Sequence, residues 1–373
     1  MCRDMTKRNV LTIGSAMVDI ITIIADHDVE RVTLQNATTS FLLVEPGRKI
    51  EAESITIHVG GGAVNVAVSM RRQGANVDVL SKLGNDINAE RIRAHFEREG
   101  LSPGQLIVTE EVPTGSSVMI AAHDRDAAIY TQRGSNTCLT PADIAHCDMN
   151  QYDLVYVSPL SKASAECFPV AITAARKSGC FTVATPGIRQ IMTRAPEVLS
   201  AMSELDLAVM NMREAEALAP ALMTHFGECP VPVRAIASAP ADMPERLRKG
   251  MRLVDEHIPL QWVMQTLLST GLKRVALTDG GQGAYLCDGE HIHHCPVHNV
   301  QVMGTAGAGD AYCSTLAYGL FCELEPSEAM KRAAFNAAGV VSHADTQTGL
   351  MSDDQLSAAV RSATDLTVTS WPL

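Results

Sequence analysis

Short apolar runs typical of β-strands alternate along this chain with amphipathic, helix-like stretches. "VLTIG" at 10–14 is followed by a helix expected from about Ala63, and "VDVL" at 77–80 by a helix expected from about Asn88. The later runs "DLVYVS", "CFTVAT", "DLAVMN" and "RVALTDG" are each followed by helix-like sequence as well. Repeated strand-then-helix units predict an α/β fold with a largely parallel, doubly wound sheet covered by helices on both faces.

Two segments interrupt this rhythm. Residues 20–26 with 54–59, and residues 116–132 around a polar Asp-Arg-Asp turn, have the pattern of antiparallel strands. We expect them to form a small β-sheet lid, from about 20–60 and 113–135, over one α/β domain of residues 1–373. A Pro-rich excursion and the helix-like sequence that returns to the core make up an atypical insertion, about 226–271.

The composition limits the classes of partner that the chain is expected to bind. The chain has 373 residues, 46% of them hydrophobic, as in a soluble globular protein. Its 30 basic and 42 acidic residues give a formal net charge of -12, and no basic patch is evident, so a nucleic-acid partner is disfavoured. Anionic ligands must therefore be held by local devices such as helix N-termini, glycine amides or a metal ion.

Cysteine usage and the N-terminus indicate a cytoplasmic protein. The ten cysteines include no Cys-x-x-Cys pair, which favours a reducing compartment. The apolar N-terminal stretch is interrupted by Asp19 and lacks a charged region followed by a cleavage site. It is therefore expected to form strands, and neither a signal peptide nor a membrane span.

"GTAGAGDA" at 304–311 places a glycine-rich turn before a helical run. Gly307 and Gly309 permit a tight turn in which the amides from Ala306 onward point into one cavity at a helix N-terminus, suited to phosphate oxygens. Asp310 in the first turn can face the same cavity. The alternative is an acid that only complements the helix dipole, worth about 0.3–1 kcal/mol.

A second glycine-rich element, "HVGGGAVNVAV" at 58–68, precedes the first long helix. Its glycines let a ligand approach the backbone, and the amide of Asn65 can bond sugar hydroxyls in both directions. A plain strand-to-helix turn is the alternative reading.

Together the two elements resemble the ribokinase and PfkB family of carbohydrate kinases, which includes fructokinases and adenosine kinases. The N-terminal family pattern is matched by Gly61, Ala63, Asn65, Ala67, Gly74 and Gly84, and the C-terminal one by Thr305, Gly307, Ala308, Gly309 and Asp310. Further matches are Asp19, Asn211, Glu214, Thr278, Gly280, Gly283 and Asn336.

This resemblance implies a ribokinase-like fold that uses ATP and Mg²⁺ to phosphorylate a hydroxymethyl group of a sugar or nucleoside. It assigns Asp310 as the base, whose basicity the helix N-terminus should lower, with Gly307, Ala308 and Gly309 stabilising the transferred charge. It implies acceptor binding by Asp19, Gly61, Gly62 and Asn65. It implies nucleotide binding by Asn211, Thr278, Gly280, Gly283, Thr305, Ala306 and Asn336, and a magnesium role for Glu214.

The chain also departs from the family pattern. Gly304 stands where relatives usually carry an acid that helps bind a monovalent cation, which leaves the need for that cation open. Thr185 and Gly187 replace the acid and asparagine of an Asp-Pro-Asn-x-Arg motif, although Arg189 remains. Met17 replaces a sugar-contacting asparagine of ribokinases. This weakens the assignment of free ribose as the acceptor and makes a nucleoside or a larger sugar an alternative acceptor.

Three alternatives stay in play at this point. "CDGEHIHHC" at 287–295 suggests zinc, but strand alternation would send His291 and His293 to one face and His294 to the other. A non-catalytic sugar- or nucleoside-binding sensor or scaffold could use the same fold. The uncovered edges of the lid strands suggest a homodimer through the lid.

Overall fold

A mostly parallel sheet organises this computed structural model, which describes residues 8–25, 30–33, 40–43, 47, 49–122, 127–227, 229, 243–253, 256–363 and 366–373. Within these residues its strand order is β18-β17-β16-β15-β12-β11-β10-β1-β6-β7. The strands are β1 (Asn9–Ile13), β6 (Asn76–Gly84), β7 (Leu106–Thr109), β10 (Leu154–Val157), β11 (Phe181–Ala184), β12 (Leu207–Asn211), β15 (Val275–Thr278), β16 (Ala284–Cys287), β17 (His291–Cys295) and β18 (Thr369–Pro372). Those from β7 to β15 pair in parallel, and β16 to β18 add an antiparallel edge.

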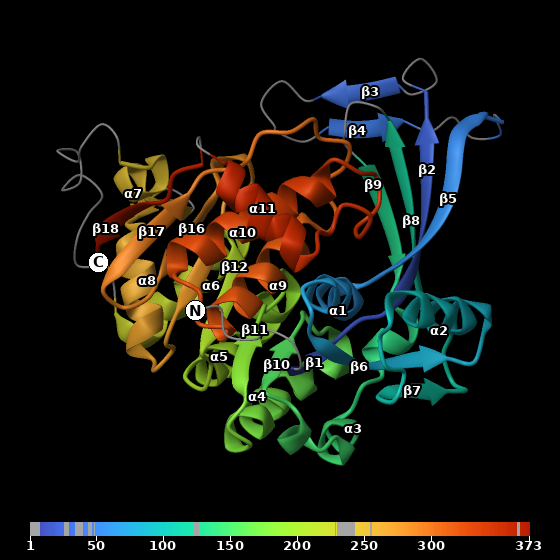
Figure 1. The fold of residues 1–373 in the computed structure, drawn as a ribbon, viewed down its shortest axis with the longest axis horizontal. Coiled ribbons are helices and arrows are strands. Elements are labelled where there is room, and N and C mark those ends of the chain that lie inside the picture. Colours follow the sequence, from blue (N-terminus) through green and yellow to red (C-terminus); the bar gives the residue numbers. More distant parts are fainter. Residues whose placement is uncertain are drawn as a thin grey trace.

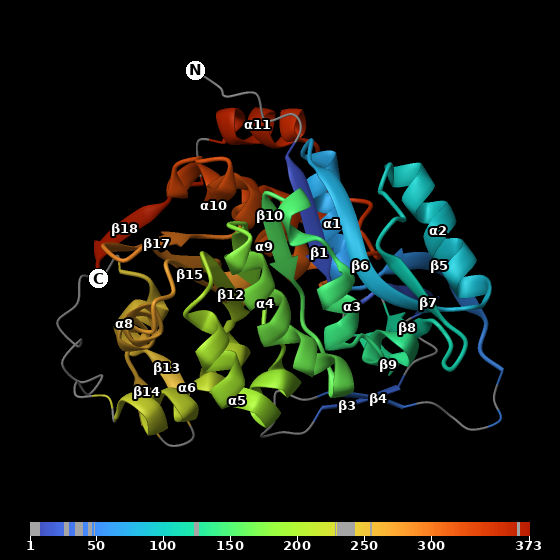
Figure 2. The ribbon, with the colours of Figure 1, turned by 90° about the horizontal axis from the view of Figure 1, so that it is seen from below.

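Helices cover both faces of this sheet (Figures 1 and 2). One face carries α1 (Gly62–Arg72), α2 (Ile87–Glu99), α9 (Ala308–Phe321), α10 (Pro326–Val341) and α11 (Asp353–Ser362). The other carries α3 (Pro141–His146), α4 (Cys167–Lys177), α5 (Ile188–Met202), α6 (Met212–Phe226) and α8 (Leu260–Ser269). The predicted doubly wound α/β fold is confirmed.

Alternation along the buried strands explains why two cores form. In β10, Val155 and Val157 face the core under α4, whereas Leu154 and Tyr156 face the core under α9. All four side chains are at most 1% exposed. A strand buried on both sides reads as one continuous apolar run, which is why these runs were recognisable in the sequence.

A second, smaller sheet rises from the carboxyl-end edge of the main sheet, at the upper right of Figure 1. Its strands are β2 (Met17–Ile24), β5 (Ala52–Gly60), β8 (Gly115–Ala122) and β9 (Ala127–Gln132), in the order β5-β2-β8-β9. A separate hairpin joins β3 (Glu30–Thr33) to β4 (Ser40–Leu43). The turn at 123–126 lies outside the described residues.

The pairing within this lid differs in one respect from the expected antiparallel sheet. β2–β5 and β8–β9 are antiparallel, but β2 and β8 run parallel, with Asp19 opposite Ser117. Both strands enter the lid from the main sheet, β2 after β1 and β8 after β7, and so they point the same way.

The insertion also differs from expectation. Its second half was expected to be one helix, but it consists of α7 (Glu245–Lys249), a hairpin of β13 (Met251–Leu253) and β14 (Glu256–Ile258), and then α8. Gly250 ends α7 with a φ of 75°, and Pro259 precedes α8. Residues 228, 230–242 and 254–255 of the insertion lie outside the described part of the chain.

No helix in the described ranges is long and apolar enough to cross a membrane. The apolar N-terminal stretch forms strands β1 and β2, as predicted.

The turn after α10 is fixed by close contact between two backbones. A Cβ added at Gly349 would overlap the carbonyl of Gly339 in α10 and lie 2.7 Å from the amide nitrogen of Val340. Only glycine allows this approach, and it places residues 345–348 beside the N-terminal half of α1.

We expect Gly349→Ala to destabilise the fold by about 1–3 kcal/mol, because backbone must move to make room for the methyl group. The midpoint of thermal or urea unfolding measures this. Gly281→Ala is the matched control, because a Cβ there meets nothing within 4 Å. Equal midpoints for the two variants would contradict the proposed contact.

Candidate active site

The candidate site lies at the carboxyl ends of the parallel strands. The chain runs from β1 to β6 and β7 on one side and later from β10 to β15 on the other, so loops diverge at β1. Ligands of open α/β sheets bind in the crevice at such a point. Asp19, Asn211 and Thr278 all follow or end strands at this edge.

Helix α1 begins at this edge against the loop after β1. Gly61 has a φ of 98°, and a Cβ there would lie 2.5 Å from the carbonyl oxygen of Ser15. The Gly62 amide donates to Ser15 Oγ at 3.0 Å and the Ala63 amide to the Ser15 carbonyl at 3.2 Å. These amides are therefore occupied by protein atoms, and the glycines are needed for the close approach itself.

Asp19 lies near the start of β2, where the lid joins the main sheet. It pairs with His58 on β5 and with Ser117 on β8, and the Ser117 hydroxyl donates to Asp19 Oδ1. Burial raises the pKa of Asp19, against the hydrogen bond from Ser117 and the charge of His58. The remaining oxygen, Oδ2, packs against Gly60, where a side chain would displace it.

Helix α9 begins at the glycine-rich turn, as predicted. Gly307 is the N-cap with a φ of 79°, and a Cβ there would lie 2.7 Å from the Cβ of Thr346. At Gly309, in contrast, an added Cβ would meet nothing within 4 Å. The turn is thus packed on one side and open on the other. The Ala308 amide donates a long hydrogen bond, of 3.4 Å, to the Thr305 carbonyl, whereas the amides of Gly307 and Gly309 have no hydrogen-bond acceptor among the described residues.

The side chain of Asn65 joins the two helix N-termini. Its Nδ2 donates to Asp310 Oδ2 at 2.8 Å, and its Oδ1 accepts from Thr346 Oγ1 and Gln347 Nε2, each at 2.9 Å. Asn65 is 5% exposed. Because Oδ1 accepts two protein hydrogen bonds, the predicted bonding of sugar hydroxyls in both directions is reduced to donation from the second N–H of Nδ2, and acceptor binding by Asn65 stays a prediction. In this structure Asn65 holds Asp310.

Asp310 is more basic than the sequence analysis expected. Burial raises the pKa of Asp310 to about 6, against the opposing effect of the hydrogen bond from Asn65. We had expected the helix N-terminus to make this carboxylate a weaker base, but removal from water has the larger effect here.

Asn211 and Glu214 form a capping box at the start of α6. The Glu214 amide donates to Asn211 Oδ1, and the Asn211 amide donates to Glu214 Oε2, both at 2.9 Å. Burial raises the pKa of Glu214, and the charge of Asp310 raises it further. The two carboxylates therefore share one electrostatic environment, although Glu214 has a structural role as well.

A cavity of about 420 Å³ extends from the start of α9. The predicted residues Thr278, Gly280, Gly283, Thr305, Ala308 and Gly309 line it. Its apolar wall comes from the segment before α9 and from α10: Val297, Val300, Val302, Ala334, Ala337, Ala338 and Val341. Apolar walls with amides at one end are what a nucleotide base and its phosphates require.

Asn336 does not line this cavity. It is 0% exposed, its Nδ2 donates to Ser69 Oγ at 3.1 Å and to Thr315 Oγ1 at 2.7 Å, and its Oδ1 accepts from the Met351 amide. The prediction that Asn336 lines an adenine pocket is thus not supported. Asn336 instead ties α10 to α1 and α9, and Ala337 and Ala338 face the cavity.

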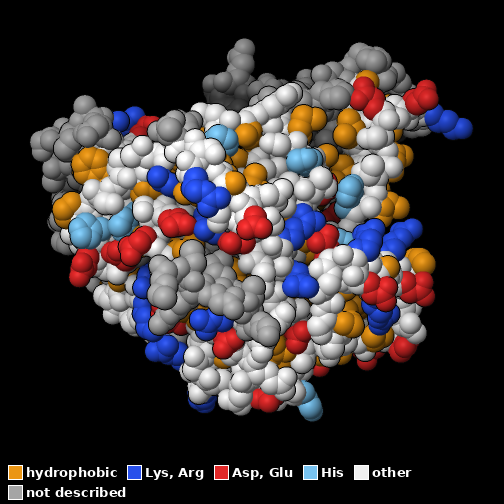
Figure 3. Space-filling view, in the orientation of Figure 1, with side chains coloured by type: hydrophobic (Ala, Val, Ile, Leu, Met, Phe, Trp, Pro, Cys, Tyr) orange, Lys and Arg blue, Asp and Glu red, His pale blue; other side chains and the backbone are white. Residues whose placement is uncertain are grey.

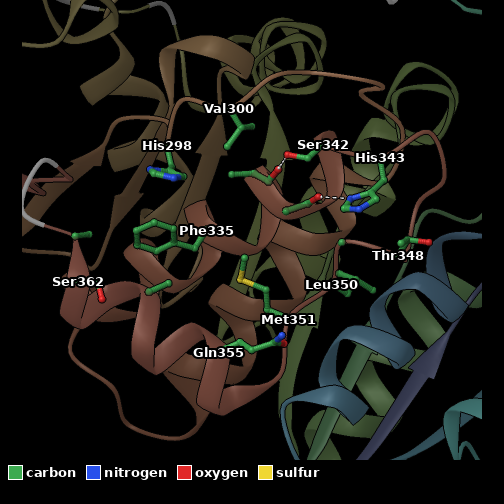
Figure 4. A pocket seen from close by; sticks show the side chains of 15 residues that line it. His298, Val300, Phe335, Ser342, His343, Thr348, Leu350, Met351, Gln355 and Ser362 are labelled. Atoms are coloured by element: carbon green, nitrogen blue, oxygen red, sulfur yellow. Dashed lines mark hydrogen bonds between the residues drawn. The ribbon is translucent and has the colours of Figure 1, made fainter.

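A second cavity, of about 610 Å³, lies beyond α10 (Figure 4). It shares His298, Val300 and Ala338 with the first cavity, and Phe335, Leu350 and Met351 give it apolar walls. In Figure 4 the polar groups of Ser342 and His343 turn back to the carbonyls of α10, to which they are hydrogen bonded. This second cavity adjoins the first but is lined by none of the predicted site residues.

The histidine-rich hairpin is structural. His293 bonds Asp288 and Ser370, and His294 bonds the carbonyl of Gln282. No group of three or more potential metal ligands occurs in the part of the chain that the structure describes.

Sequence reasoning missed Ser15, Ser117, Thr346 and Gln347. Ser15 lies two residues after the end of β1, in "IGSAM". A polar residue at the end of a central strand is a signal that could have identified Ser15 as a site residue. Thr346 and Gln347 lie 281 and 282 positions from Asn65, in a loop without a glycine pattern that would have signalled a site.

Comparison with known proteins decides the family. The pattern of the family described as "pfkB family carbohydrate kinase" matches residues 7–239 and 251–353. The chain belongs to the PfkB family of carbohydrate kinases. The break in the PfkB match, at 240–250, falls within the insertion.

Characterised relatives of this PfkB protein are sugar kinases at low identity. A deoxyribokinase of Salmonella typhi is 25% identical over 353 residues, covering 93% of this chain and 97% of the relative. A ribokinase of Staphylococcus aureus is 26% identical over 281 residues, covering 73% and 79%.

Solved structures share the fold. A Burkholderia thailandensis nucleoside kinase in complex with inosine superposes with a TM-score of 0.69 at 14% identity, covering 95% of this chain and 98% of that one. A Cryptococcus neoformans ribokinase in complex with ADP gives a TM-score of 0.67 at 18% identity, covering 94% and 99%. The ribokinase-like sheet, helices and smaller second sheet are thereby confirmed.

We expect Asp310→Asn to raise stability at pH 8 and to leave it unchanged near pH 4. The pKa of Asp310 is about 6 in the folded protein and 3.8 ordinarily. Ionisation of this carboxyl therefore lowers the free energy of unfolding above pH 6, and has no such effect where the carboxyl is protonated. Unfolding midpoints at the two pH values measure this.

Asp288→Asn is the control with the opposite sign. Burial raises the pKa of Asp288, but hydrogen bonds from His293 and from backbone amides outweigh it and lower the pKa to about 2. The ionised form therefore stabilises the fold above about pH 4, and its removal should lower the midpoint at pH 8. If Asp310→Asn shifted the midpoint equally at both pH values, the assigned pKa would be wrong.

Proposed function

We propose that the protein is an ATP-dependent kinase that transfers a phosphoryl group to a hydroxymethyl group of a sugar or nucleoside, with Asp310 as the base. The observation that carries this proposal is the Asn65–Asp310 hydrogen bond at the open N-terminus of α9. It holds a carboxylate with a pKa near 6 beside amides that a phosphoryl group can use.

The donor nucleotide fits the cavity along α9 and α10. Its apolar wall suits a base, and Thr278, Gly280, Gly283, Thr305 and Ala306 are proposed to surround the phosphates at the other end. The open space at Gly309 allows phosphate oxygens to reach the amides of Gly307 and Gly309, and that of Ala308 if its long bond to the Thr305 carbonyl, at 3.4 Å, is exchanged for a phosphate oxygen. The fungal ribokinase that shares this fold was solved in complex with ADP, which supports an adenine nucleotide as the ligand.

Magnesium is compatible with the residues present. Mg²⁺ commonly takes one or two carboxylates and completes its shell with phosphates and water, so a cluster of three protein ligands is not required. Glu214 is the proposed carboxylate, near enough to Asp310 for their charges to interact, with Asn211 holding it. Bound there, Mg²⁺ would neutralise charge on the transferred phosphoryl group.

The acceptor is proposed to lie between the lid and α1. The contacts of Thr346 join Gly60, beside Asp19, to Asn65 and hence to Asp310, so the two carboxylates border one region. Asp19 Oδ2 has no hydrogen-bond partner among the described residues and can accept a substrate hydroxyl, and the Gly61–Gly62 backbone borders the same region. Above pH 6 the ionised Asp310 accepts the proton of the attacking hydroxyl as the phosphoryl group is transferred.

Two finer features complete the proposal. The lid presents Ile57, Val118 and Tyr130, which are 48%, 37% and 64% exposed, at paired positions across its strands. These apolar side chains support a homodimer through the lid. The cytoplasm is the proposed compartment, because the cysteines at 138, 147, 167, 180, 287, 295, 313 and 322 are free thiols.

The decisive experiment is magnesium-dependent ATP consumption with a panel of sugars and nucleosides. We expect turnover with at least one acceptor, and a loss of about 10²-fold or more in Asp310→Asn with acceptor binding retained. Asp288→Asn, a carboxylate change outside the site, should keep its turnover. Ligand binding without any turnover across the panel would instead identify a sensor.

The pH dependence of kcat/KM for the acceptor tests the basicity of Asp310. We expect the value to fall about tenfold per pH unit below pH 6 and to level off above it, because only the ionised carboxylate accepts the proton. Circular dichroism at the lowest pH would confirm that the protein remains folded. A flat profile from pH 5 to 8 would exclude a base with this pKa.

A further inference from the structure

A cavity of about 630 Å³ lies between β5, α2 and the loop at 345–348, apart from the residues assigned to the donor and the acceptor. Arg and His side chains gather on this part of the surface, between β5 and α2 at the right of Figure 3. The basic residues that line it are His58, Arg72, Arg91, His95 and Arg98, and the acidic ones are Glu99 and Asp345. In a chain with a net charge of -12, three arginines around one cavity stand out from the rest of the surface.

Only part of this charge is neutralised within the protein. Arg72 forms a two-fold contact with Glu99, at 2.8 and 3.1 Å, and donates to the carbonyls of Gln347 and Leu350. Asp345 Oδ1 accepts from the amides of Gln347 and Thr348, which helps keep its pKa low although burial opposes this. Arg72 is therefore paired, and Glu99 also interacts with the charge of Arg98, whereas Arg91 and Arg98 form no ion pair with either carboxylate that lines the cavity.

Those two arginines are presented by one face of α2. Arg91, Ala94, His95 and Arg98 follow helical spacing and all line the cavity. Arg91 is exposed and has no hydrogen-bond or ion-pair partner among the described residues. Arg98 Nη2 lies 2.9 Å from His95 Nδ1, its contact within the protein.

His95 adds a buried polar group without a full set of partners. It is 7% exposed, and burial lowers the pKa of its imidazole, which is therefore neutral at pH 7. With Nδ1 facing the donor Arg98, Nε2 carries the proton. Gln347 is close enough to affect the pKa of His95, but Nε2 has no hydrogen-bond partner among the described residues. Among the described residues, no hydrogen-bond acceptor is found for the Arg91 guanidinium, for the N–H groups of Arg98 that do not face His95, or for the Nε2–H of His95.

The wall of this cavity is shared with the candidate active site. Gln347 lines the cavity, and its Nε2 donates to Asn65, which in turn holds Asp310. Thr346, the neighbouring residue, contacts Asn65 from the same loop. The cavity therefore lies behind the residues that position the proposed base.

We propose that this cavity binds a small oxyanion, a phosphate or carboxylate group, held by Arg91 and Arg98. Guanidinium groups pair with the oxygens of either group in two-fold geometry, and a free anion supplies the acceptors that the protein lacks here. The site is independent of ATP and of the acceptor, and its test needs no catalytic activity.

The test titrates the purified full chain with inorganic phosphate, and separately with malonate, against chloride at constant ionic strength, and follows the unfolding midpoint. We expect a saturable rise with at least one of the two oxyanions, because a ligand that binds only the folded state stabilises it. The stronger response distinguishes a phosphate site from a carboxylate site. In Arg91→Gln/Arg98→Gln the apparent Kd should rise at least tenfold.

Arg93→Gln is the matched control, an arginine on the same helix that does not line the cavity, and it should respond like the wild type. Arg91→Gln alone repeats the test if the double variant is less stable, because Arg91 has no partner to lose. The proposal is overturned if neither oxyanion raises the wild-type midpoint. It is equally overturned if the arginine variants keep the wild-type response, since the anion would then bind elsewhere, for example at the N-terminus of α9.

Discussion

The hydrogen bond from Asn65 to Asp310 is the interaction on which the candidate site depends. It crosses from the first long helix of the chain to a helix 245 residues later, and it joins the two glycine-rich turns that the sequence makes recognisable. Asn65 can orient Asp310 only because Thr346 and Gln347 saturate its other end. Those residues are placed in turn by the close approach of Gly349 to Gly339. A backbone contact beyond α10 thus sets the position of a carboxylate in α9.

Several residues of the site have a structural and a chemical role at once. Asn211 and Glu214 cap α6 with each other's backbone amides, and the same bonds fix the carboxylate that we assign to magnesium. Gly61 makes room for the loop after β1 and borders the proposed acceptor region. A matching motif therefore cannot separate ligand binding from helix capping, because both need the same residue at the same place.

Much of the fold could be predicted because its determinants are local. Buried parallel strands read as apolar runs, and helices such as α1, α6 and α9 carry a glycine or a side-chain cap at their start. The failures depend on distant contacts. Nothing near Asn336 indicates that Ser69 and Thr315 would bury its amide, and nothing near Asn65 indicates Thr346 and Gln347. The three cavity arginines likewise stand at 72, 91 and 98 with no basic run, so a search for a basic patch along the chain misses them.

The electrostatics of the site follow from what the fold buries. Withdrawing Asp310 from water raises its pKa to about 6. Burial also raises the pKa of Glu214, and the charge of Asp310 adds a smaller effect in the same direction. Two partly buried acids with raised pKa values oppose folding near pH 7, and the fold must offset them elsewhere. Hydrogen bonds from Asn65 and from the α6 cap offset part of this cost locally. A positively charged phosphoryl-binding partner such as Mg²⁺ would relieve the rest, so ligand binding and the stability of this site should be strongly linked.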